Sequence, residues 1–197
     1  PLWHKDIVSQ LKEDDYGILR SGSGFPFIWQ TEVALMYTHG GKGRRIHYIV
    51  LMPNRDVVKQ FIDIITKKWR VDYDGRPIFG LSSIEFVDLM RSISTDIEVI
   101  PAHAFTSWMA IFGSKSGYDS LKECFEERTK HIHAIETGMS SDPAMDRRLS
   151  QLDNINLVSF SDPHTYFPWR LGREATRFDC ELTYQGILHA IRTGEGL

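Results

Sequence analysis

The sequence has few cysteines and no long apolar run, and both absences narrow the classes of protein it can encode. Only two cysteines, Cys124 and Cys180, occur in 197 residues, far apart and outside any Cys-x-x-Cys pair. This argues against a disulfide scaffold and a structural zinc finger within these residues, and it favours a reducing, cytoplasmic setting. No stretch approaches the roughly 18 consecutive apolar residues of a membrane helix, so we expect no membrane partner.

The chain also lacks internal repeats, low-complexity segments and a strong charge imbalance. Lysine and arginine total 23 against 26 acidic residues, a net charge of −3. This value does not indicate a nucleic-acid-binding protein. It decides nothing about local patches, however, because nuclease sites are acidic at the metals and basic around them. Length and an apolar content of 42% are those of one globular domain with a sizeable core.

Hydrophobic periodicity and turn residues predict an α/β fold. Strands at 27–37 and 45–52 flank a glycine-rich turn and are expected to form a hairpin. Downstream, the order strand, loop, helix recurs three times, which implies a largely parallel sheet or a barrel. The later strands are predicted at 97–101, 133–135 and 156–160. Helices are predicted at 55–70, 82–93, 120–128, from Asp142 onward and at 183–193, with a turn at 74–77.

Residue types that bind metals sit at the ends of the three later strands and inside the two early ones. The carboxyl ends of strands form the face where folds of this kind bind ligands. Imidazole and carboxylate together suit zinc, manganese or iron, and such ions hydrolyse phosphodiesters when a carboxylate bridges them. The residues are His103, Glu136, Asp162 and His164 after the later strands, and Glu32 and His47 within the early ones.

Each of these residues also has an ordinary interpretation. A single histidine at a strand end is more often a satisfied polar residue than a ligand, and Glu32 could face solvent from its strand. Glu136 could orient a ligand instead of binding a metal. Their joint placement is what favours a metal site.

Aromatic and basic residues occupy the loops after His103 and His164. Such mixtures stack bases and hold phosphates, although the same residues could simply pack the loops. Their place on the same rim as the predicted ligands favours a nucleic acid. The first loop contains Phe105, Trp108, Phe112, Lys115 and Tyr118, and the second contains Tyr166, Phe167, Trp169, Arg170, Arg173 and Arg177.

Seven strings, in order over nearly the whole chain, carry a resemblance to a known family: Thr31–Val33, Asp74–Pro77, Pro101–Thr106, Phe112–Gly117, Glu136–Pro143, Ser161–His164 and Pro168–Ala175. Together they resemble the endonuclease Q family of the polymerase-and-histidinol-phosphatase (PHP) superfamily. The resemblance implies a distorted (β/α)7 barrel, incomplete here at the amino terminus, and two or three divalent metal ions. Zinc is favoured, with manganese or magnesium as alternatives. Endonuclease Q nicks DNA 5′ of deaminated bases such as uracil and hypoxanthine, and at abasic sites, which implies a DNA-repair function.

The resemblance also assigns roles residue by residue. Glu32 is expected to bridge two metals, with His47 and His103 completing the ligands of one of them. Asp162 is expected to bind a second metal and His164 a third, and these two with Glu32 are the expected catalytic residues. The residues expected at the base or the DNA are Ser140, Ser141, Arg170, Arg173, Lys115 and Trp108.

The chain departs from the family at both ends. The superfamily's first motif, a His-x-His near the start of the protein, is absent, as is a histidine that in relatives precedes the Pro-Leu-Trp found here at 1–3. A cysteine-rich zinc-binding part at the carboxyl terminus is also absent. We therefore expect residues 1–197 to form a partial PHP-type phosphoesterase domain that lacks full activity unless the missing segment is supplied. Pro163 replaces the alanine usual between Asp162 and His164, which keeps both ligands.

Two other functions remain open from the sequence. One is a phosphoesterase acting on a small phosphate ester, as histidinol phosphatase does. The other is a non-catalytic nucleic-acid-binding domain with a degenerate metal site, which fits a short ligand set.

Overall fold

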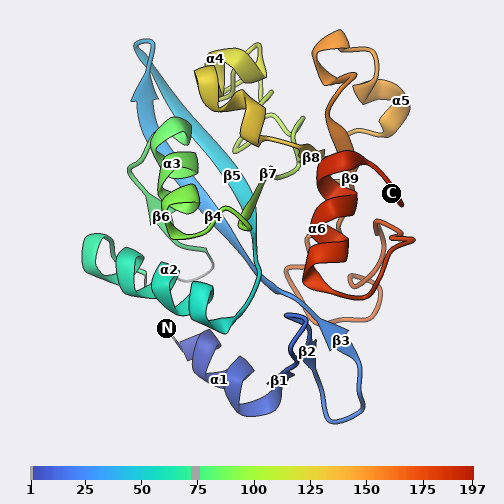
Figure 1. The fold of residues 1–197 in the computed structure, drawn as a ribbon. Helices are drawn as coiled ribbons and strands as arrows, with labels where there is room; N and C mark the ends of the chain where they lie inside the picture. The colour runs from blue at the N-terminus through green and yellow to red at the C-terminus, as the bar shows by residue number, and fades with distance from the viewer. Residues whose placement is uncertain (1, 72–75) are drawn as a thin grey trace.

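A long antiparallel hairpin is the centre of the fold (Figure 1). The computed structural model describes residues 2–71 and 76–197. Strands β4 (Trp29–His39) and β5 (Lys42–Met52) pair along their full lengths. They join through Gly40 and Gly41, whose φ angles of 60° and 73° are in the left-handed region that glycine adopts without a steric penalty. The predicted hairpin is confirmed, with both strands extending further into the turn than expected.

Short strands add to the hairpin and form two further sheets. The main sheet has the order β6-β4-β5-β7, in which only the β4–β6 pair is parallel. Strands β8 and β9 form a separate parallel pair, and β1, β2 and β3 form an antiparallel sheet. The bounds are β1 (Lys12–Glu13), β2 (Leu19–Arg20), β3 (Pro26–Phe27), β6 (Ile78–Phe79), β7 (Glu98–Pro101), β8 (Ala134–Glu136) and β9 (Asn156–Val158).

The expectation of a largely parallel sheet is therefore wrong for the main sheet. A two-residue turn returns the chain antiparallel, which fixes the direction of the long β4–β5 pair, and β7 also pairs antiparallel with β5. Among the strands predicted from the sequence, only β8 and β9 pair in parallel; the other parallel pair is formed by β4 with the short strand β6. Over the described ranges 2–71 and 76–197 the strands form three sheets and no closed barrel. The α/β class is confirmed, and the PHP barrel remains a prediction.

The predicted helix signals hold where side-chain caps are strong. Asn54 accepts a hydrogen bond from the Val57 amide at 3.0 Å to start α2 (Arg55–Lys68). Ser82 and Glu85 form the predicted capping box of α3 (Ser83–Ile93). Gly194, with φ of 82°, ends α6 (Tyr184–Thr193). The predicted turn at 74–77 lies partly outside the described residues, which exclude Asp74 and Gly75.

Two predicted helices are shorter than expected. The segment 120–128 contains α4 (Leu121–Phe125), which stops at Glu126 because that residue has a φ of 48°. A 3-10 helix, η1 (Glu126–His131), follows it. After Asp142, α5 (Pro143–Asp146) has four residues and is followed by η2 (Ser150–Leu152). The first helix, α1 (Leu2–Gln10), and the β1–β3 sheet were not predicted. No helix in the described part of the chain is long and apolar enough to cross a membrane.

The main sheet separates two cores. On one face, Ile46, Tyr48 and Val50 of β5 pack in the larger core with residues of α2 and α3. On the other face, Ile49 and Leu51 pack with residues of α6 in a smaller core. Figure 1 shows α2 and α3 on the side of the sheet opposite α6. Because side chains alternate along a strand, the α6 face is also where Glu32 and His47 must point.

Candidate metal centre

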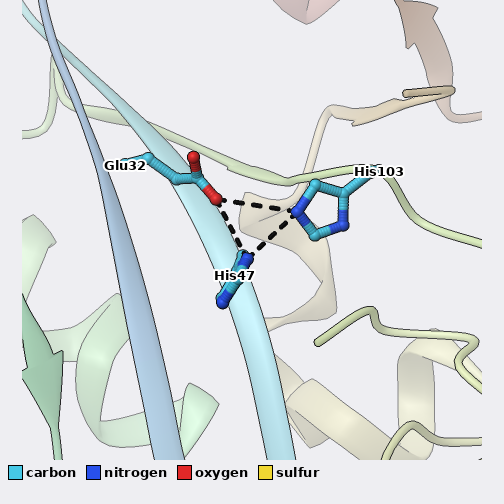
Figure 2. Close-up of side chains that lie close together, drawn as sticks. All are labelled: Glu32, His47 and His103. Atoms are coloured by element: carbon cyan, nitrogen blue, oxygen red, sulfur yellow. Dashed lines mark hydrogen bonds and ion pairs between the residues drawn. The ribbon is translucent and has the colours of Figure 1, made fainter. Parts of the chain in front are cut away.

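Three potential ligand atoms converge on the α6 side of the sheet (Figure 2). Glu32 Oε1 lies 3.0 Å from His47 Nδ1 and 3.6 Å from His103 Nε2, and the two histidine nitrogens are 3.0 Å apart. An ion bound tetrahedrally at about 2.0–2.2 Å would separate its ligands by about 3.3–3.6 Å. These side chains are the three in the described ranges that can share an ion, and the spacing fits one divalent metal.

The sheet register explains why Glu32 and His47 meet. Glu32 pairs with Ile49, and Ala34 pairs with His47. Paired residues of an antiparallel sheet point to the same face, so Glu32 and His47 are diagonal neighbours within reach of long side chains. His103 arrives from the end of β7, where the Ala102 amide donates to the His47 carbonyl at 3.0 Å.

The backbone of His103 is held in a strained conformation by β8. Its φ of 31° is unusual for a residue with a Cβ and is found mostly where function requires it. The His103 amide donates to Glu136 Oε2 at 2.7 Å, and the Ala104 amide donates to the Glu136 carbonyl at 2.8 Å. Gly138, with φ of 57°, lies directly against His103 and leaves no room for a Cβ. These contacts fix the position from which the imidazole reaches the cluster.

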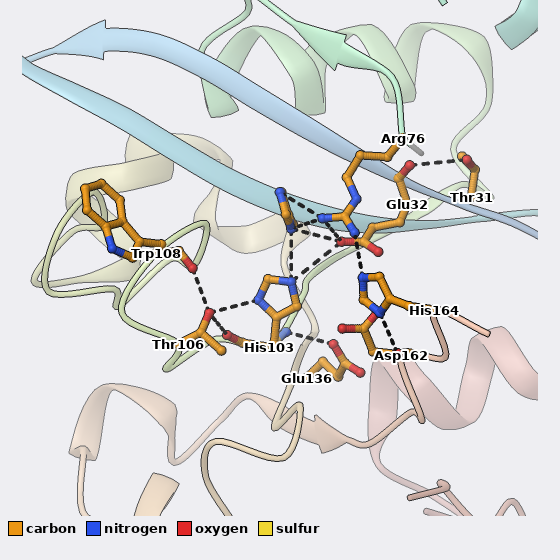
Figure 3. Close-up of polar contacts among 10 residues, drawn as sticks. Thr31, Glu32, Arg76, His103, Thr106, Trp108, Glu136, Asp162 and His164 are labelled. Carbon is orange, nitrogen blue, oxygen red and sulfur yellow. Dashed lines mark hydrogen bonds and ion pairs between the residues drawn. The ribbon is translucent and has the colours of Figure 1, made fainter. Parts of the chain in front are cut away.

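Thr106 orients the ring of His103 and was not singled out as a site residue. Its hydroxyl lies 3.1 Å from His103 Nδ1 and donates to the Trp108 carbonyl at 2.8 Å (Figure 3). A partner on Nδ1 leaves Nε2 facing the cluster, as in metal sites where the second nitrogen of a histidine is held. The only sequence signal was its place in the Pro101–Thr106 string.

Burial and charge together set the protonation of the cluster. Burial would raise the pKa of Glu32, but hydrogen bonds from His103 and His47 and the charge of Arg76 lower it to about 2. Burial lowers the pKa of His47, while Glu32 outweighs burial at His103 and raises that pKa. Glu32 is therefore ionised at neutral pH, as a metal ligand requires.

Arg76 is a residue of the site that the sequence argument did not assign. Its Nη1 lies 3.2 Å from Glu32 Oε1 and 2.6 Å from His47 Nδ1, and its Nη2 lies 3.5 Å from His164 Nε2 (Figure 3). It belongs to the Asp74–Pro77 string, which could have pointed to it. A guanidinium here neutralises Glu32 and offers further donors to an anion.

Asp162 and His164 lie at the edge of the site, outside the cluster of three. Asp162 has a φ of 42°, and its Oδ1 is 3.6 Å from His164 Nδ1. The His164 side chain is 68% exposed and approaches the cluster through Arg76. The structure does not bring these two within ligand distance of the other three, so their metal-binding roles remain predictions.

Glu136 is placed as an orienting residue. It lies inside β8 and not after it, is 1% exposed, and holds the His103 amide. Its Oε1 is buried with no hydrogen-bond partner among the described residues, and burial raises the pKa of its carboxyl. The sequence left two roles open for Glu136, a metal ligand or a residue that orients a ligand. An experiment can distinguish them.

We expect Glu136→Gln to retain the metal stoichiometry of the chain. The amide oxygen can still accept from the His103 backbone, and the neutral side chain suits a buried position, so metal affinity should fall by less than about tenfold. Glu136→Ala removes the acceptor and should lower affinity by about 10–100-fold. Competition with a chromogenic chelator measures both. Complete loss of metal in Glu136→Gln would show that Glu136 is a ligand.

A cavity of about 540 Å³ adjoins the cluster. Glu32, His103, Glu136 and Asp162 line one part of it, and side chains of β5 and α6 give it apolar walls. An apolar pocket with a few convergent polar groups is the usual form of a substrate site.

The residues predicted to contact DNA lie outside the cluster of three, and all of them except the half-buried Ser141 are exposed. Ser140 and Ser141 turn back on their own loop, each donating to the Thr137 carbonyl at 3.2 Å. Trp108 is 52% exposed and lies near Arg45, whose guanidinium carbon is 5.8 Å from the ring centre. Lys115, Arg170 and Arg173 are exposed. Their contacts with a ligand remain predictions.

Comparison with solved structures identifies the relatives of this fold. The lesion-specific endonuclease PfuEndoQ from Pyrococcus furiosus superposes with a TM-score of 0.82 at 28% identity, covering 98% of this chain and 45% of that one. An endonuclease Q complex with a 27-mer duplex substrate bearing an abasic lesion at the active site also gives 0.82, at 29% identity, covering 97% and 45%. No protein-family model matches the chain.

Two curated relatives are described as uncharacterised proteins. A Methanocaldococcus jannaschii protein is 30% identical over 79 residues, which are 40% of this chain and 9% of the relative. YqxK of Bacillus subtilis is 31% identical over 132 residues, 66% of this chain and 32% of the relative. The chain thus spans less than half the length of the relatives it matches. Its α/β fold carries a candidate carboxylate–histidine metal centre. The structural matches confirm the resemblance seen in the sequence: the chain is endonuclease Q-like.

Proposed function

We propose that this chain is the metal-binding part of a DNA endonuclease of the endonuclease Q type. The observation that carries the proposal is the convergence of Glu32, His47 and His103 in a fold that matches part of endonuclease Q over nearly the whole length of this chain. We further propose that residues 1–197 form a partial PHP-type domain, and that the complete site holds two or three divalent ions, zinc before manganese or magnesium. The proposed reaction hydrolyses the phosphodiester 5′ of a deaminated base or an abasic site.

The chain's own residues would bind and orient the substrate. A divalent ion held by Glu32, His47 and His103 would supply a hydroxide at neutral pH and stabilise charge on the phosphate. Arg76 would donate to a phosphate oxygen, since its guanidinium already lies at the cluster. The adjoining cavity would receive an extruded nucleotide, at a cost of about a few kcal/mol that is lower for a weakly paired, deaminated base.

The remaining residues of the proposed site lie around this core. Asp162 and His164 would add metal-binding and catalytic groups beside Glu32, and Ser140 and Ser141 would lie near the extruded base. Arg170, Arg173, Lys115 and Trp108 would contact the DNA, consistent with their exposure.

We expect Asp162→Asn to lower the metal content of the chain while its DNA affinity stays within about twofold, because an amide is a poor metal ligand but keeps the side-chain shape. Elemental analysis and DNA binding measure the two effects. Asp153→Asn, at an exposed carboxylate, is the matched control. Unchanged metal content in Asp162→Asn would rule out Asp162 as a ligand.

The nicking assay tests the reaction itself. The 197-residue chain alone is expected to show little or no steady-state turnover on a uracil-containing or abasic duplex, and Asp162→Asn to show none. Robust cleavage by the chain alone would contradict the proposal that it is a partial domain.

One observation favours a second candidate, a non-catalytic nucleic-acid-binding domain. In the described ranges only three potential ligands converge, fewer than a multi-metal site needs. This candidate is tested after adding the segments that a complete relative contains and this chain lacks. Salt-dependent DNA binding without metal-dependent hydrolysis would then favour the non-catalytic domain.

A further inference from the structure

Residues 163–173, here called the aromatic loop, form an exposed and locally basic segment next to the metal centre. Every residue of the loop is exposed. It contains Tyr166, Phe167 and Trp169, two arginines and a histidine, and no acidic residue, in a chain with a net charge of −3. The loop therefore departs from the rest of the chain in both charge and apolar exposure.

The three aromatic rings stack on one another and not on the core. The rings of Phe167 and Trp169 are nearly parallel, 6° apart, with centroids separated by 4.7 Å. Tyr166 and Phe167 have centroids 5.1 Å apart at 31°. Tyr166 remains 84% exposed, Phe167 41% and Trp169 68%. Several solvent-exposed aromatic rings in one segment indicate a binding surface more often than incidental packing of a loop.

Hydrogen bonds at its base hold the loop in shape. Arg173 Nε donates to the Ser161 carbonyl at 3.1 Å, and Ser161 Oγ donates to the Glu174 carbonyl at 2.9 Å. The Arg170 amide donates to the Phe167 carbonyl at 2.8 Å, closing a turn that contains Pro168. A surface ordered before binding loses less conformational entropy when a ligand arrives.

The loop begins at the candidate centre. Asp162 precedes it and lines the cavity beside Glu32 and His103. His164, within the loop, lies 3.5 Å from Arg76 (Figure 3). DNA bound at the centre would thus pass close to the stacked rings.

We propose that the aromatic loop binds an unpaired nucleobase of the DNA by stacking, with Arg170 and Arg173 on the neighbouring phosphates. The inference rests on the proposed DNA substrate but not on the metal centre. A base inside a duplex has both faces covered, whereas the base opposite an abasic site has no pairing partner and leaves the stack at lower cost. An aromatic face accepts any base, and two arginines in an acid-free loop complement phosphate charge. The loop would therefore favour DNA containing an unpaired base.

Fluorescence anisotropy in EDTA tests this with three labelled DNAs: a duplex with one tetrahydrofuran abasic site, the same duplex fully paired, and the single strand. We expect Trp169→Ala to weaken binding of the abasic duplex and the single strand about tenfold or more, and of the paired duplex less than about twofold. Trp169→Phe should keep most of the affinity because it keeps a ring face. Leu171→Ala, at a 55% exposed apolar residue of the same loop, is the matched control and should have little effect.

Three results would overturn the proposal. Equal loss on all three DNAs would make the loop a general DNA contact with no preference for an unpaired base. No effect of Trp169→Ala would mean that the rings serve another purpose, such as packing against further parts of a longer chain. If the wild-type chain bound none of the three DNAs, the aromatic loop would not be a DNA-binding surface. Because EDTA removes metal ions, the anisotropy measurement does not depend on the metal centre. Failure of the metal-centre proposal would appear separately, as absence of bound metal in elemental analysis. Circular dichroism should find unchanged folding, since the substituted ring is outside the core.

Discussion

Glu32→Gln is expected to remove metal binding, lowering affinity by at least about 100-fold in chelator competition, because even supporting residues of a metal site contribute about 10–100-fold. Glu32 supplies the single carboxylate of the cluster, and its Oε1 faces both His47 and His103. Burial raises its pKa, but the two histidines and Arg76 outweigh burial and lower it to about 2, so the wild-type ligand is charged across the neutral range. Glutamine preserves the shape but offers a neutral oxygen.

Elemental analysis after equilibration with zinc or manganese and removal of free ions provides the measurement. Glu127→Gln, at an exposed carboxylate of η1, is the matched control and should bind metal as the wild type does. Retention of metal by Glu32→Gln would refute the assignment of Glu32 and, with it, the centre proposed here. Loss of metal by both variants would point to non-specific binding to surface carboxylates.

Gly138→Ala should disrupt the centre although residue 138 carries no ligand. A Cβ at this position would overlap the Cα and Cβ of His103, and rotation of the His103 side chain moves neither atom because the backbone fixes both. Relief requires His103 to move, which also breaks the hydrogen bond from its amide to Glu136. We expect metal affinity to fall at least about tenfold. The free energy of unfolding should fall by about 2–4 kcal/mol, combining overpacking with the left-handed φ.

Gly41→Ala separates the two causes. Gly41 also has a left-handed φ, 73°, but a Cβ there meets nothing within 4 Å. That variant should lose only about 1–2 kcal/mol of stability and keep its metal affinity. Urea unfolding and chelator competition on both variants are sufficient. Equal effects of the two substitutions on metal affinity would show that contact with His103 is not the reason Gly138 is required.

Local signals in the sequence were sufficient for elements whose causes are local. Asn54, the Ser82–Glu85 capping box and Gly194 set helix ends through hydrogen bonds or backbone freedom within a few residues. The hairpin was predictable for the same reason, since its turn glycines lie between two apolar runs. The helix predicted at 120–128 failed where Glu126 adopts a positive φ that no nearby residue type signals.

Local signals could not predict which strands pair when the strands are far apart in the sequence. Strands of two to four residues, such as β6 and β7, have their partners chosen by the hairpin already in place, so the recurrence of strand and helix could not reveal antiparallel neighbours. The same limit applies to the site. Arg76 comes from the segment before β6, and only the folded chain places its guanidinium beside Glu32.

The sequence by itself determined the α/β class, the hairpin, the helix caps and the residue types of the centre, because alternation, capping and side-chain chemistry are properties of short segments. Only the tertiary structure decided which of those residues meet. Glu32, His47 and His103 converge through the register of β4 with β5 and through the contacts of His103 with Glu136 and Gly138. Asp162 and His164, at the end of an irregular segment after β9, remain at the edge. Distances between side chains depend on register and long-range packing, which no single segment encodes.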